Sequence, residues 1–79
     1  MDRQYVGMDF HRRRSVMVRV SPSGEKLSCV RIPNDPVAIA AAVAEAGPDP
    51  EVVVEATYGW YWVVDLLQAS GARVHLANP

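Results

Sequence analysis

The sequence predicts an α/β domain with a mixed sheet, in which three strands precede a helix, a fourth strand, a second helix and a last strand. Three observations lead to this fold class. The first part of the chain alternates apolar and polar residues with a period of two, as half-buried strands do. The remainder holds two segments with helical spacing of apolar residues, separated by a valine run. Strands joined by short turns pair antiparallel, whereas strands joined through a helix become parallel.

The first three predicted strands cover residues 4–10, 15–20 and 26–32. In the second of them three valines share one face, whereas Ser15, Met17 and Arg19 share the other, which is typical of a half-buried strand. Residues 21–24, with the sequence Ser-Pro-Ser-Gly, form a turn because proline supplies a fixed φ and glycine a permissive one. The connection at residues 11–14 then lies between the first two strands.

The first helix is predicted over residues 37–46. Asp35 is a good N-cap and Pro36 suits the first helical position, while Gly47 ends the helix. The stripe that faces the core comprises Ile39, Ala42, Val43 and Ala46. Glu45 is nearly the only charge on the outer face, so we expect a second surface to cover this helix in a longer protein.

The second half of the sheet is predicted from residues 51–55 and 73–77, with a helix over residues 60–70 between them. Three consecutive valines in the strand at 51–55 are typical of a parallel strand covered on both faces. Gly71 ends the second helix. The stripe of this helix that faces the core comprises Trp60, Val63, Val64 and Leu67.

Composition restricts the classes of protein to which the chain can belong. It has 79 residues, enough for one domain, and its 49% hydrophobic and 22% charged residues exclude a disordered chain. No apolar run approaches the roughly 18 residues that a membrane span needs, and the polar start does not resemble a secretory signal. Cys29 is the single cysteine, which suits a reducing cytoplasm. The net charge of −1 lacks the basic excess of a self-sufficient nucleic-acid binder, although residues 11–14 form a dense basic block.

Two carboxylates end two predicted strands, Asp9 after the first and Glu55 after the fourth. If these strands lie parallel and adjacent, both carboxylates emerge at the C-terminal edge of the sheet, where α/β proteins bind ligands. Such a pair can hold Mg²⁺, which prefers oxygen ligands, and metal pairs of this kind cleave phosphodiesters. The alternative is structural: Asp9 begins a turn and Glu55 caps the helix that follows. On the residues alone, the structural alternative is favoured.

Three segments of the chain resemble the N-terminal domain of the DEDD transposases of the insertion-sequence one-ten family, which includes the pilin-gene inverting recombinases. They are Tyr-Val-Gly-Met-Asp-Phe-His at residues 5–11, Val-Val-Val-Glu-Ala-Thr-Tyr-Gly-Trp at 52–60 and Val-His-Leu-Ala-Asn-Pro at 74–79. The resemblance covers essentially the whole chain and implies a ribonuclease-H-like (RuvC-like) fold that is incomplete here. It makes Asp9 the first acid and Glu55 the second acid of the catalytic tetrad.

The resemblance also implies a function for a longer parent protein. It would catalyse metal-dependent DNA strand cleavage and transfer with Mg²⁺ or Mn²⁺, guided by an RNA that the element encodes. DNA, the guide RNA and further copies of the chain would be its partners in the bacterial cytoplasm. The other two aspartates and the C-terminal domain of the family lie beyond the Asn-Pro motif. Residues 1–79 are therefore expected to be the N-terminal part of the catalytic domain, to bind metal weakly and to be inactive alone.

Further residues are candidates for nucleic-acid binding. Arg12, Arg13 and Arg14 can contact phosphates or simply form a solvated turn. His11 can orient a phosphate or close that turn, and Thr57 can present a helix N-terminus to an anion or merely cap the helix. The aromatic run Trp60, Tyr61 and Trp62 can stack on bases, but we expect Trp60 to lie in the core and Tyr61 or Trp62 to cover the neighbouring helix.

Two other functions agree with the same predicted fold. An actin-like sugar kinase also opens with a Gly-x-Asp strand and a hairpin, but it needs a glycine-rich phosphate loop, for which residues 21–24 are a poor candidate. A non-catalytic nucleic-acid-binding or dimerisation module would keep the fold without the activity.

Overall fold

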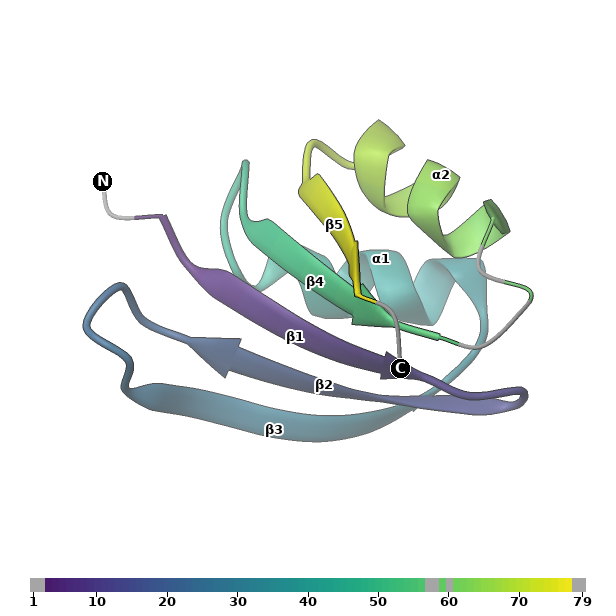
Figure 1. Ribbon diagram of the computed structural model, residues 1–79, viewed down its shortest axis with the longest axis horizontal. Helices are drawn as coiled ribbons and strands as arrows, with labels where there is room; N and C mark the ends of the chain where they lie inside the picture. The colour runs from purple at the N-terminus through teal and green to yellow at the C-terminus, as the bar shows by residue number, and fades with distance from the viewer. Residues whose placement is uncertain (1–2, 57–58, 60, 78–79) are drawn as a thin grey trace.

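The computed structural model describes residues 3–56, 59 and 61–77 as a mixed five-stranded sheet with two helices (Figure 1). The elements in chain order are β1 (Tyr5–Phe10), β2 (Arg14–Val20), β3 (Lys26–Pro33), α1 (Pro36–Ala44), β4 (Glu51–Glu55), α2 (Tyr61–Ala69) and β5 (Arg73–Ala77). The α/β class and the order of elements are confirmed. The boundaries differ from the predicted ones by two residues at most.

The strands lie in the order β3-β2-β1-β4-β5. β1 pairs antiparallel with β2, and β2 pairs antiparallel with β3, as the short turns between them require. β1 pairs parallel with β4, which pairs parallel with β5. The condition on which the carboxylate prediction depended, a parallel β4 directly beside β1, is therefore met.

Both helices cover one face of the sheet (Figure 1). The crossovers from β3 to β4 and from β4 to β5 run in the same direction across the sheet, so the right-handed rule puts α1 and α2 on the same side. Val52 and Val54 are fully buried under them, whereas Val53 between them is 45% exposed. The expectation that this strand is covered on both faces is thus wrong for the part of the chain that the structure describes. We call the uncovered side the open face.

The position of the helices determines which face of each strand is buried. In β2 the covered side carries Ser15 and Met17, which lie opposite Phe10 and Met8 of β1. The valine side of β2 lies on the open face. The buried cluster joins the covered face of the sheet to the two helices. It comprises Val6, Met8, Phe10, Met17, Ile39, Val43, Ala46, Val52, Val54, Ala56, Val63, Leu67 and Ala72.

The predicted signals at the ends of α1 are confirmed. Asp35 is the N-cap, and its Oδ2 accepts a hydrogen bond of 2.9 Å from the backbone N–H of Ala38. Gly47 follows the helix with a φ of +96°. Val37, on the outer side of the helix, is 77% exposed. Among the described residues, no helix is long and apolar enough to span a membrane.

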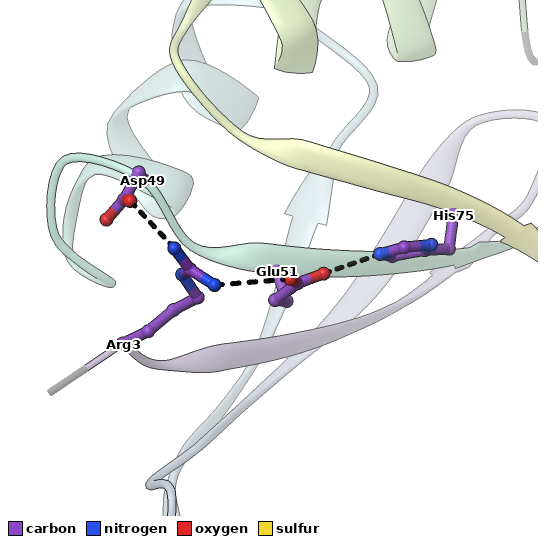
Figure 2. Close-up of polar contacts among 4 residues, drawn as sticks. All are labelled: Arg3, Asp49, Glu51 and His75. Carbon is purple, nitrogen blue, oxygen red and sulfur yellow. Dashed lines mark hydrogen bonds and ion pairs between the residues drawn. The ribbon is translucent and has the colours of Figure 1, made fainter.

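A polar network joins the segment before β1 to the beginning of β4 and to β5 (Figure 2). Arg3 contacts Asp49 at 3.2 Å through Nη2 and Glu51 at 3.5 Å through Nη1. Glu51 Oε2 also lies 2.5 Å from His75 Nε2. The network therefore ties the edge strand β5 to β4, and it gives His75 a structural contact.

Candidate metal and nucleic-acid site

Asp9 and Glu55 lie directly opposite each other in the register of the parallel pair β1 and β4. Neighbouring strands are about 4.8 Å apart. Both residues belong to the alternate set that faces away from the helices, and both are exposed. The tertiary structure thus brings together two acids that are far apart in the sequence, at the C-terminal ends of two parallel strands.

A shallow hollow of about 390 Å³ lies beside the two acids on the open face. Its lining comprises Gly7, Met8, Asp9, Val16, Val18, Val53 and Glu55. Gly7 makes its floor low, because a Cβ built at that position would meet no heavy atom within 4 Å. The hollow therefore combines an apolar floor with carboxylates on one side, and it has room for a hydrated cation.

The donors present fit a hard cation only in part. Two carboxylates supply oxygen ligands of the type that Mg²⁺ prefers, and Mg²⁺ usually keeps several waters. Among the described residues, no group of three or more His, Cys, Asp or Glu side chains is arranged to hold a metal ion. Asp9 and Glu55 together supply two carboxylates, so waters or other residues would have to complete the octahedral shell of Mg²⁺.

His11 lies beside this pair. Its Nε2 is 3.1 Å from Asp9 Oδ2, and its backbone N–H donates to the carbonyl of Arg14 at 3.1 Å. This backbone hydrogen bond closes the turn, which agrees with the structural alternative for His11. The ring also places a nitrogen against the carboxylate that a metal would need.

Sequence reasoning missed Asn34, which holds the basic turn in place. Its backbone N–H donates to the carbonyl of Arg13 at 2.9 Å, and its Nδ2 donates to the carbonyl of His11. Its Oδ1 accepts a 2.6 Å hydrogen bond from the hydroxyl of Ser15, a fully buried residue. The signal in the sequence is a polar residue before Asp35, and the Asp-Pro pair that follows indicates a helix cap alone.

The basic turn between β1 and β2 is solvent-exposed, including all three of its arginines. Within the described part of the chain, neither Arg13 nor Arg14 lies within ion-pair distance of a carboxylate.

Sequence reasoning also missed Arg31. It lies opposite Val16, which in turn lies opposite Asp9, so all three share one cross-strand row. Positive charge thus flanks the acids from two sides.

The aromatic residues at the start of α2 are less buried than we expected. Trp62 is 39% exposed and Tyr61 is 68% exposed. Trp62 packs edge-on against Phe10 of β1, with ring centroids 5.6 Å apart and an interplanar angle of 69°. Trp62 therefore covers the end of β1 through this ring contact, and Tyr61 lies largely exposed. Trp60 and the candidate anion-binding residue Thr57 lie outside the described residues.

The turn at residues 21–24 lies at the other end of β2 from the acids. Val20, immediately before it, pairs with Tyr5 at the start of β1. The turn is closed by a hydrogen bond of 2.9 Å from Gly24 N–H to the carbonyl of Ser21. The turn that was the candidate phosphate loop of the sugar-kinase alternative therefore lies at the opposite end of the sheet from Asp9.

No family model matches the chain, and no curated protein is significantly similar to it in sequence. The resemblance to the DEDD transposases thus rests on the sequence motifs alone.

Proposed function

We propose that this chain is the N-terminal part of the RuvC-like, ribonuclease-H-like catalytic domain of a DEDD transposase of the insertion-sequence one-ten family. The observation that carries the proposal is the register of Asp9 and Glu55 at the ends of adjacent parallel strands. The motifs make these two residues the first two acids of the tetrad, and the tetrad requires them to be neighbours. The parent protein would cleave and transfer DNA strands under the guidance of an RNA.

Each residue of the site has a role in this proposal. The carboxylates of Asp9 and Glu55 bind Mg²⁺ or Mn²⁺ through oxygen atoms. The bound metal supplies charge neutralisation at the scissile phosphate. Arg13 and Arg14 attract the flanking phosphates without reading sequence. His11 holds the orientation of Asp9 when no cation is bound.

Binding of Mn²⁺ to residues 1–79, followed by electron paramagnetic resonance, tests the proposal. We expect weak, saturable binding that Asp9→Asn and Glu55→Gln each abolish. Glu25→Gln is the matched control, because Glu25 is an exposed acid in the turn at the opposite end of β2. Equal binding by all four proteins would overturn the metal site.

A cleavage assay addresses the completeness of the site. Because the chain supplies two of the four acids, we expect no cleavage of duplex or branched DNA by residues 1–79 with either metal. Robust cleavage that Asp9→Asn abolishes would contradict this expectation.

The contact between His11 and Asp9 favours a second candidate function, a non-catalytic nucleic-acid-binding module. In such a module the imidazole takes the place beside Asp9 that a cation would otherwise occupy. Loss of nucleic-acid binding in Arg13→Ala/Arg14→Ala, together with no Mn²⁺ binding at the acids, would select this candidate over the first.

A further inference from the structure

We propose that Trp62 is a stacking platform for an unpaired nucleobase, and that the edge of the sheet around the basic turn binds single-stranded nucleic acid. This inference rests on the proposed function, because it places a nucleotide of the substrate or guide next to the acid pair. It names a binding residue beyond those acids and the arginines.

The first observation is the way in which Trp62 is held. Phe10 is 7% exposed and belongs to the core, and its ring packs edge-on against the indole. Such a contact fixes the orientation of the indole, while 39% of the residue stays open to solvent. A rigid, exposed aromatic ring loses little conformational freedom when a ligand stacks on it.

The second observation is the position of this ring beside uncompensated positive charge. Phe10 directly precedes His11, so the indole lies next to the beginning of the basic turn. In Figure 1 the β1–β2 turn and the start of α2 lie at the same end of the sheet. Arg13 and Arg14 there are exposed and have no carboxylate partner within the described chain. Single-strand binders combine these two features, a positive track for phosphates and an aromatic ring for each base.

The third observation is that the acids lie on the other side of the same turn. Asp9 faces the open face, whereas Phe10 faces the helices and contacts Trp62. A strand that crosses the turn would stack one base on the helix side and carry its backbone over the arginines towards the acids. A base inside a duplex has no free face for stacking, so the ligand is an unpaired nucleotide.

Fluorescence anisotropy with labelled ten-nucleotide oligomers in EDTA tests this inference. The oligomers are oligothymidylate, oligouridylate and an abasic strand of the same length. We expect Trp62→Leu to weaken binding of at least one of the two base-bearing oligomers by about 5- to 150-fold, and to leave binding of the abasic strand unchanged. The ratio of the oligothymidylate and oligouridylate affinities shows whether the base comes from DNA or RNA. Trp62→Phe keeps an aromatic face and should retain most of the affinity.

Salt dependence separates stacking from charge. The slope of log K against log salt concentration should be unchanged in Trp62→Leu. In Arg13→Ala/Arg14→Ala the slope should become shallower by about 1.4, because each lost phosphate contact on a single strand removes ~0.7 from it. Equal loss on base-bearing and abasic strands would show that Trp62 acts only through the structure and would overturn the proposal. Undetectable binding at low salt would overturn the proposal, and so would an affinity that Trp62→Leu leaves unchanged. Because EDTA removes metal, these results are independent of the Mn²⁺ test of Asp9 and Glu55.

Discussion

Replacement of Asn34 by alanine is the perturbation that tests most directly how this fold positions its basic turn. The change removes the donor to the carbonyl of His11 and the acceptor of the Ser15 hydroxyl. Ser15 is fully buried, so its hydroxyl would lose its partner without gaining water. An orphaned buried donor costs about 1–3 kcal/mol, and the second hydrogen bond contributes about 0.5–1.5 kcal/mol.

We therefore expect Asn34→Ala to lower the free energy of unfolding by about 1.5–4.5 kcal/mol. A chain of this length has roughly 4–12 kcal/mol in total, from about 0.05–0.15 kcal/mol per residue. The substitution would remove a large share of that stability. Urea unfolding followed by circular dichroism measures the change through the midpoint, at constant m.

A double-mutant cycle checks the physical reason for the loss. Ser15→Ala alone removes the hydroxyl that would be orphaned, and the partly exposed Asn34 can turn its free Oδ1 towards water. We expect this single change to cost about 0.5–1.5 kcal/mol. The pair Asn34→Ala/Ser15→Ala should then cost about 1 kcal/mol or more less than the sum of the two single changes. Asn34→Asp keeps the acceptor for Ser15 and should fall between wild type and Asn34→Ala. Strict additivity would refute the orphaned-hydroxyl explanation.

Two further matched pairs test the packing. Gly71 has a φ of +94°, and a Cβ there would lie 2.6 Å from the carbonyl oxygen of Pro48, so Gly71→Ala should destabilise the fold by more than about 1 kcal/mol in urea unfolding. Gly7→Ala meets no such neighbour and should leave the urea midpoint unchanged or raise it. A large loss of stability in this variant would show that other atoms fill the space beside Gly7 on the open face. Val52→Thr would bury a hydroxyl at a fully buried position and should cost about 1–3 kcal/mol. Val53→Thr, on the 45% exposed neighbour, should change the free energy of unfolding by less than about 0.5 kcal/mol, and similar losses at both sites would contradict one-sided covering of β4.

Local signals in the sequence determined the elements of this fold and the placement of its two acids. The Asp35-Pro36 pair and Gly47 delimit α1 through backbone geometry, which depends on nearby residues alone. The ends of the strands place Asp9 and Glu55 at carboxyl termini, because strand boundaries follow from short apolar runs.

Only the tertiary structure decided which face of each strand is buried. A period of two marks two faces without saying which one meets a helix, and in β2 the valine face turned out to be the open one. That choice followed from two crossovers running in one direction, a property of strand order rather than of any one strand. The contacts of Asn34 with His11 and Ser15, and of Trp62 with Phe10, join segments distant in the chain. No local pattern encodes such contacts, because each depends on how the sheet and helices pack together.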